Sequence, residues 1–105
     1  MEKFKHDHIK SWSFVSSRAI DKAKFEKWIK MLYTLRPYAM LRMKGVLKFR
    51  KTDRPVLIQA VGNKISDFRK LENWPSNEDQ NNLTLIFKEL EYSAVSASFA
   101  RWVLK

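Results

Sequence analysis

The stretch that most restricts the fold is LRMKGVLKFR, residues 41–50, in which apolar and basic side chains alternate. Alternation with period two is typical of a β-strand that has one face covered and the other in water. The covered face is expected to carry Leu41, Met43, Leu47 and Phe49, and the other face Arg42, Lys44, Lys48 and Arg50, with Gly45 and Val46 between the two sets. The pattern predicts a strand with one basic face.

Further strands are expected on both sides of this one along the chain. The segment IKSWSFVS, residues 9–16, alternates and predicts a first strand with a bulky aromatic face. After the turn TDRP, the apolar run 56–61 predicts a buried strand, and Gly62-Asn63 is a hairpin signal that leads to a second arm near residues 65–71. The segment LTLIFKEL predicts the last strand. Short hairpin connections indicate a mainly antiparallel sheet.

Two segments have helical spacing. Asp21 is a candidate N-cap, and the helix after it is expected to end near Arg36, because Pro37 disfavours helical geometry in the residue before it. The apolar stripe of this helix is Phe25, Trp28, Ile29, Leu32 and Leu35. A closing helix is expected from about Tyr92, with the stripe Val95, Phe99, Trp102 and Val103.

The order strand, helix, strands, helix predicts an α+β fold in two layers. We expect a mainly antiparallel sheet of four to five strands with two helices on one face, formed by residues 1–105 as a single domain. The crossover through the first helix can also set one pair of strands parallel. Trp28 and Trp102 are expected to face the sheet, with Trp12 beneath them. Trp74 lies beside Pro75 in a polar loop and is not assigned to the core; if exposed, it suggests a contact surface for another domain.

The charge of the chain is strongly basic and unevenly distributed. The formal net charge is +10; residues 1–54 hold 15 Lys and Arg against 5 Asp and Glu, and residues 55–105 hold 6 of each. Such a charge attracts anionic partners, including the phosphates of nucleic acid. Lys and Arg on the exposed side of a strand are also ordinary solubilising residues. Both interpretations of Arg42 and Lys44 stay open at this point.

Several kinds of chemistry find no support in the motifs. The chain has no GxxxxGK[ST] loop, GxGxxG turn, HExxH spacing or GxSxG elbow, and it has no cysteine, so catalysis by this chain alone is not expected. No apolar run approaches the roughly 20 residues that span a bilayer, which predicts a soluble, cytoplasmic domain.

A metal site is one of two interpretations of HDH, residues 6–8. In an extended segment His6 and His8 lie on one side, where their imidazoles could share a cation. Tetrahedral zinc requires at least three protein donors, so a third ligand has to come from elsewhere. The other interpretation is a solvated segment that enters the first strand.

The order of motifs resembles the C-terminal domain of the CobW family of GTPases from about His6 to Leu104. The similar segments are HDHIKSWSF, IDKAKFEKWIKML, LRMKGVLKF, RPVLIQAVGNKI, ENWP and NNLTLIFKEL. Their most specific parts are Arg-x-Lys-Gly at Arg42, Lys44 and Gly45, the strand end Gln59-Ala60-Val61-Gly62, the pair Trp74-Pro75, and the strand Leu83 to Leu90.

The resemblance implies that the chain is a part of a longer metal-handling GTPase that serves metal insertion or cobalamin biosynthesis. The chain is expected to be a regulatory domain, or one that contacts a metal or a client, with Arg42 and Lys44 in interdomain or anion contacts. Its partners are expected to be an N-terminal GTPase domain and a metalloprotein client. Zinc or cobalt is the implied metal, and GTP and magnesium are expected in the parent protein. The alternative is a small basic nucleic-acid-binding domain.

Overall fold

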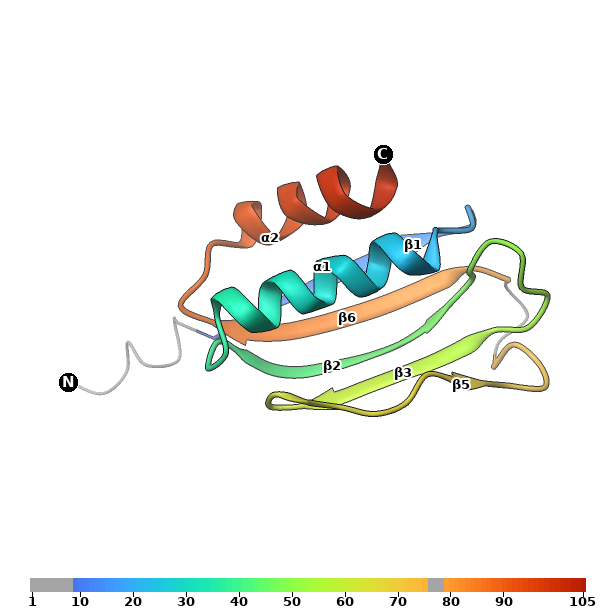
Figure 1. Ribbon diagram of the computed structural model, residues 1–105, viewed down its shortest axis with the longest axis horizontal. Coiled ribbons are helices and arrows are strands. Elements are labelled where there is room, and N and C mark those ends of the chain that lie inside the picture. Colours follow the sequence, from blue (N-terminus) through green and yellow to red (C-terminus); the bar gives the residue numbers. More distant parts are fainter. Residues whose placement is uncertain (1–8, 76–78) are drawn as a thin grey trace.

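The sheet and its two helices form the two predicted layers in the computed structural model, which describes residues 9–75 and 79–105. Both helices lie on the same face of the sheet (Figure 1). The elements in chain order are β1 (Ile9–Ser16), α1 (Lys22–Leu35), β2 (Met40–Leu47), β3 (Val56–Val61), β4 (Lys64–Ile65), β5 (Arg69–Lys70), β6 (Asn81–Lys88), α2 (Tyr92–Phe99) and a π-helical segment, η2 (Ala100–Leu104). The predicted α+β class and element order are confirmed.

The strand order is β1-β6-β2-β3-β4, with β5 also paired to β3, so the described part of the chain forms a six-stranded sheet. The predicted second arm near residues 65–71 is divided into β4 and β5, which accounts for the strand beyond the expected four to five. Between them Phe68 packs against the core, with its ring 6.1 Å from that of Phe25.

Every pair of strands in the described part of the chain is antiparallel, and the parallel pairing that the crossover allowed is reduced there to an isolated bridge between Ile20 and Phe49. The last strand, β6, lies between β1 and β2 and is antiparallel to both. Its inward side chains are Asn81, Leu83, Leu85 and Phe87, all at 0% exposure. This completely buried row is most stable in the middle of the sheet, where both of its edges are also paired.

An irregularity in β2 corrects one predicted inward side chain. The register of β2 with β6 shifts between Met40 and Arg42, so Met40 is buried while Leu41 stays partly exposed. A bulge adds one residue to a strand and changes the face on which the side chains before it lie. Beyond the bulge the predicted alternation holds, because Met43, Leu47 and Phe49 are buried while Arg42 and Lys44 are exposed.

Aromatic side chains join the two layers beneath the helices. Trp12 of β1, Trp28 of α1 and Phe99 of α2 meet with ring centroids 4.9 to 5.8 Å apart. The indole N–H of Trp28 donates to Ser98 Oγ at 2.9 Å, so this buried polar group is satisfied. The core placement predicted for Trp12 and Trp28 is confirmed.

Two predicted stripe residues lie outside the core. Trp102 is 39% exposed and Leu35 is 66% exposed. The wider π-helical turn of η2 places Val103 in line with Val95 and Phe99, and it turns Trp102 outward. Leu35 is the last residue of α1, beyond the part of the helix that packs on the sheet.

The start of α1 provides a test of pH dependence. Asp21 is the N-cap, as predicted, and its Oδ1 accepts a hydrogen bond from the backbone N–H of Lys24 at 2.9 Å. This hydrogen bond is the main reason that the pKa of the Asp21 carboxyl lies below its usual value. Because the folded-state pKa is the lower one, the cap stabilises the fold above the usual pKa of about 3.9, and this stability is lost as the pH falls through the folded-state pKa.

We therefore expect Asp21→Ala to lower the melting temperature at pH 7 and to have little effect at the acid end of the stability curve. Asp21→Asn is the matched variant, because asparagine keeps the cap acceptor without the charge. It is expected to melt close to the wild type at pH 7 and to show a weaker acid dependence. Thermal melts across the acid range, followed by circular dichroism, measure both effects; equal acid dependence in all three proteins would contradict the assignment.

Candidate functional site

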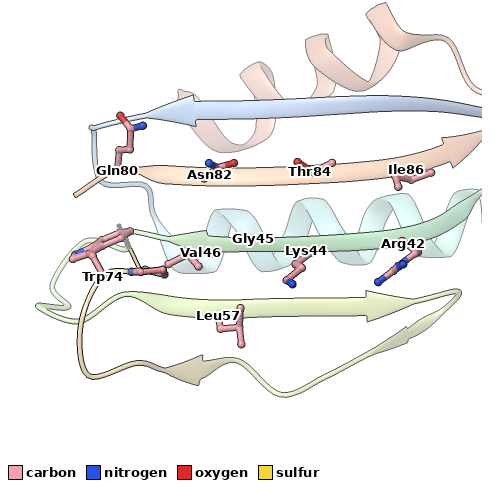
Figure 2. Close-up of a pocket in the computed structure, with 11 residues that line it drawn as sticks. Arg42, Lys44, Gly45, Val46, Leu57, Trp74, Gln80, Asn82, Thr84 and Ile86 are labelled. Carbon is pink, nitrogen blue, oxygen red and sulfur yellow. The ribbon is translucent and has the colours of Figure 1, made fainter. Parts of the chain in front are cut away.

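The face of the sheet opposite the helices is uncovered in the described part of the chain, and it carries the basic side chains of β2. On this face Lys44 lies across from Thr84 of β6 and Gln59 of β3. Arg42 lies one step further along β2, across from Ile86 and Val61. Figure 2 shows the basic side chains of β2 projecting from this face, with the helices behind the sheet. The predicted basic face is therefore an open surface.

A groove of about 670 Å³ follows this surface. Its apolar part is formed by Val46, Leu57 and Ile86, and the cations Arg42 and Lys44 line it along β2. Its remaining lining residues are Gly45, Trp74, Pro75, Gln80, Asn82 and Thr84. Among the described residues, the lining holds cations, amides, a hydroxyl and an indole but no carboxylate, histidine or cysteine. These groups suit the binding of an anion through charge-assisted hydrogen bonds.

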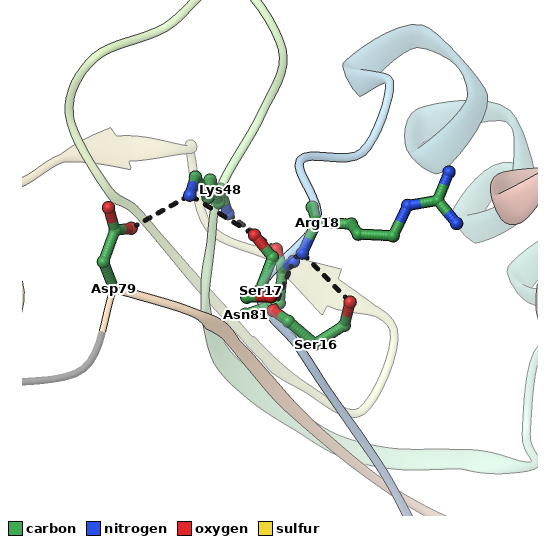
Figure 3. Close-up of polar contacts among 6 residues, drawn as sticks. All are labelled: Ser16, Ser17, Arg18, Lys48, Asp79 and Asn81. Carbon is green, nitrogen blue, oxygen red and sulfur yellow. Dashed lines mark hydrogen bonds and ion pairs between the residues drawn. The ribbon is translucent and has the colours of Figure 1, made fainter.

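The four basic residues of the predicted strand have different environments. The side chains of Arg42 and Lys44 make no hydrogen bond or ion pair with another described residue, and both line the groove. Lys48, in contrast, lies 3.5 Å from Asp79 in an ion pair and donates to the carbonyl of Ser17 at 3.3 Å (Figure 3). The structure thus brings Arg42 and Lys44 together as available cations and leaves Lys48, and Arg50 beyond the strand, outside the groove.

Trp74 is the tryptophan that the sequence did not assign to the core. Its loop runs between β5 and β6 and places the half-buried indole at the Val46 end of the groove (Figure 2). The pair Trp74-Pro75 marks a turn in the sequence, but nothing in the local pattern indicates that this turn reaches β2. The three-dimensional fold brings this loop to β2, where Trp74 and Val46 line the same groove.

Asn81 fixes the strand ends next to the groove. Its side chain is fully buried, accepts a hydrogen bond from the backbone N–H of Lys48, and donates to the carbonyls of Ser16 and Arg18. The first residue of β6 therefore binds the ends of both neighbouring strands (Figure 3). The sequence gives no local signal for this role of Asn81, because a polar residue at the start of a strand usually faces water.

The predicted metal ligands His6 and His8 lie outside the described residues. Within residues 9–75 and 79–105, no three His, Cys, Asp or Glu side chains are grouped in a way that could hold a metal ion. In the same described residues, no helix has the length and apolar character needed to cross a membrane.

The fold and the groove define a small α+β domain that presents one open, cationic sheet face in its described part. The chain belongs to the family described as the cobalamin synthesis protein cobW C-terminal domain, whose model matches residues 9–103. The resemblance found in the sequence motifs is therefore confirmed. No curated protein is similar enough in sequence to count as a relative.

Two solved structures have the same fold. One is the crystal structure of the Zn(II)-bound YjiA GTPase from E. coli, with a TM-score of 0.79 and 20% identity over 93% of this chain and 30% of that chain. The other is a Zn(II)-bound triple mutant of YjiA GTPase, with a TM-score of 0.78 and 20% identity over 90% of this chain and 30% of that chain. The chain thus spans about 30% of these solved relatives.

Proposed function

We propose that this chain is the C-terminal regulatory or client-interaction domain of a CobW-type GTPase that handles a metal ion, and that it has no catalysis of its own. The observation that carries the proposal is the family match over residues 9–103, together with the 30% share of the YjiA GTPase that the chain spans. In this proposal residues 1–105 are one domain of a longer cytoplasmic protein. Its N-terminal neighbour binds GTP and magnesium, and a metalloprotein is the client.

The open sheet face is the surface through which such a domain could respond to its neighbour. Arg42 and Lys44 are exposed and without a described partner, so they can meet an anionic group on the GTPase domain. A change of nucleotide would then alter how the two domains pack, because the contact differs between the two nucleotide states.

The metal served by this protein is proposed to be zinc or cobalt. YjiA GTPase was crystallised with Zn(II), which supports zinc for that protein. In this chain the proposed contact is through His6 and His8, which would need a third donor from another domain or a client. Metal contact by these two histidines stays a prediction.

The proposal is tested first on the gene and then on the encoded protein. A Walker loop, GxxxxGK[ST], is expected in the reading frame ahead of Met1, and a frame without one would contradict the proposal. In the full-length protein we expect hydrogen exchange of the β2 and β6 amides to slow by about tenfold in one nucleotide state, with either GDP or a non-hydrolysable GTP analogue bound.

Two variants make this test specific. Lys44→Ala is expected to remove the nucleotide-dependent protection, whereas Lys27→Ala, which removes a lysine from the exposed side of α1, is expected to leave it intact. Equal protection of β2 and β6 with both nucleotides in the wild-type protein would contradict a regulatory contact through this face.

The alternative of a sequence-tolerant nucleic-acid-binding domain is not favoured by the open face. Proteins of this kind stack successive bases on several aromatic side chains. The strand residues that alternate onto this face are Ile9, Ser11, Ser13, Val15, Arg42, Lys44, Val46, Leu57, Gln59, Val61, Asn82, Thr84, Ile86 and Lys88, none of which is aromatic.

A further inference from the structure

We propose that the groove binds one nucleoside phosphate, with the base against Trp74 and the phosphate against Lys44 and Arg42. This goes beyond the proposed regulatory or client-interaction role, because the chain would bind such a ligand without a GTPase domain. Three separate observations carry it: the position of one indole, the spacing of two cations, and the size and floor of the groove between them.

The indole of Trp74 is placed to stack on a planar ligand. Trp12 and Trp28 each make ring contacts in the core, whereas Trp74 makes no ring contact or hydrogen bond with another described residue. It is only half-buried and lines the groove of about 670 Å³. A large ring at the end of a groove, without a ring or hydrogen-bond partner among the described residues, favours stacking with the base of a ligand.

The cations follow the indole at intervals set by the strand. Trp74 lies beside Val46, and two residues of an extended strand span about 7 Å, so Lys44 lies about 7 Å and Arg42 about 13 Å further along β2. A ligand that bridges these groups has a planar end and an anionic end separated by a short spacer. A nucleoside phosphate has this form, because a ribose separates its base from its phosphate.

The groove between the two ends has suitable walls for the spacer. Val46 and Leu57 provide apolar contact, and the Asn82 amide provides a hydrogen-bonding group for ribose hydroxyls. The Thr84 hydroxyl shares one hydrogen bond with the Ser13 hydroxyl at 3.2 Å. Because a hydroxyl oxygen has two lone pairs, Thr84 can still accept a hydrogen bond from the ligand. Charged guanidinium and ammonium groups bind phosphate strongly when no carboxylate competes for them.

The size of the groove, and the presence of a single aromatic residue in its described lining, favour one nucleotide over a strand of nucleic acid. Its volume of about 670 Å³ lies within the range of small-molecule sites, which is roughly 300 to 1,000 Å³. A strand of several nucleotides would need further aromatic platforms, and the open-face residues of the four long strands supply none.

The test uses the whole 105-residue chain and GMP as the probe, followed by ¹⁵N NMR. We expect GMP to shift the Trp74 indole signal together with the backbone amides of Lys44 and Thr84, with a dissociation constant of about 1 mM or below. Guanosine, which lacks the phosphate, and ribose 5-phosphate, which lacks the base, are each expected to bind at least about tenfold more weakly. Binding of GMP should also weaken as salt is added.

Variants assign the two ends of the ligand. Trp74→Ala is expected to lower GMP affinity by about tenfold, the loss of one stacking contact, while ribose 5-phosphate binding stays unchanged. Lys44→Ala is expected to weaken both ligands. The matched controls are Trp102→Ala and Lys27→Ala, which remove an exposed indole and an exposed cation outside the groove and are expected to bind GMP as the wild type does.

Three outcomes would overturn the proposal. One is the absence of any NMR shift at about 10 mM GMP, a concentration about tenfold above the highest dissociation constant expected. Another is equal affinity for GMP and ribose 5-phosphate, which would leave only an anion contact. The third is binding of a ten-nucleotide RNA about 100-fold more tightly than GMP, which would identify a single-strand surface. A reading frame without a Walker loop would contradict the proposed function and leave GMP binding by this chain unaffected, so failure of one proposal can be told from failure of the other.

Discussion

Asn81→Leu is expected to lower the free energy of unfolding by about 4 kcal/mol, a large effect for one polar side chain. The asparagine is completely buried at the start of β6. Its Oδ1 accepts from the backbone N–H of Lys48 at 2.7 Å, and its Nδ2 donates to the carbonyls of Ser16 and Arg18 at 3.0 and 2.7 Å. Leucine has a similar size and leaves all three backbone groups without their partner.

The loss of unfolding free energy is large because the three backbone groups are left without the hydrogen-bond partner that Asn81 provides. A buried donor or acceptor that loses its partner costs about 1 to 3 kcal/mol, more than the hydrogen bond itself contributes. Ser16 is the last residue of β1, Arg18 follows it by two residues, and Lys48 follows directly after β2. The variant therefore also releases the ends of both strands that flank β6. Chemical denaturation, monitored by tryptophan fluorescence, measures the effect. The denaturant concentration at the unfolding midpoint is expected to fall, whereas the dependence of the unfolding free energy on denaturant is expected to stay the same.

The neighbouring residue provides a matched control. Asn82 is next in the chain but lies exposed on the open face, so Asn82→Leu makes the same chemical change and is expected to alter stability by no more than about 0.5 kcal/mol. Similar losses at both positions would contradict the role given to the buried amide.

A second substitution at the same position separates hydrogen bonding from packing. Asn81→Asp keeps the acceptor for Lys48 but turns a second oxygen toward the carbonyls of Ser16 and Arg18. Ionisation of the new carboxyl is disfavoured there, so its folded-state pKa is expected to be raised. The protonated form can donate a hydrogen bond, so the stability lost relative to the wild type is expected to shrink as the pH falls below that pKa.

Local patterns predicted those elements whose causes lie within a few residues. The first helix was bounded by the Asp21 cap and by Pro37, and it was observed as Lys22–Leu35. The alternation around Met43 and Lys44 identified the two faces of β2, because strand geometry alone sends successive side chains to opposite sides. In both cases the responsible interactions are backbone geometry and short-range capping.

The arrangement of the strands depended on contacts that no local pattern reports. The placement of β6 between β1 and β2 pairs Trp12 with Leu85 and Met43 with Leu85, across long stretches of chain. Burial on both sides, and not propensity, decides which strand is central. The same holds for the groove: the sequence predicted its cations on β2, but Trp74 and the apolar floor come from other segments.

The two misassigned stripe residues have a common explanation. Leu35 and Trp102 were both placed by extending a regular helical stripe to its last turn. A stripe describes which side of a helix is apolar, whereas burial also requires that the opposing layer extend that far. At Trp102 the helix geometry itself changes, because the chain passes from α2 into the π-helical η2.

Gly45→Ala is expected to destabilise the protein by about 3 kcal/mol, the upper part of the range for overpacking a well-packed core. Gly45 lies in β2 directly opposite Leu83 of β6, in the centre of the sheet. A Cβ at this position would lie 2.6 Å from the backbone oxygen of Asn82 and 2.9 Å from Leu83 Cα. Because these are backbone atoms, the two strands themselves have to move apart.

The second glycine of the chain is the control, because it is required for a different reason. Gly62 has a φ of 58° in the turn after β3, and a Cβ there would meet nothing within 4 Å. Gly62→Ala is therefore expected to lower the free energy of unfolding by about 1 kcal/mol, the cost of a positive φ for a residue with a Cβ. Gly62→Asn is expected to cost less, since asparagine tolerates a positive φ.

A double variant shows whether the backbone is the obstacle at Gly45. The Leu83 side chain also lies 2.9 Å from the added Cβ, and Leu83→Ala would remove that contact but not the contacts with the backbone of β6. We expect the loss from Gly45→Ala to be nearly the same in the wild-type and Leu83→Ala backgrounds, as a double-mutant cycle on unfolding free energies would measure. Substantial rescue by Leu83→Ala would mean that a side chain, and not the close approach of β2 and β6, requires glycine in the Arg-x-Lys-Gly motif.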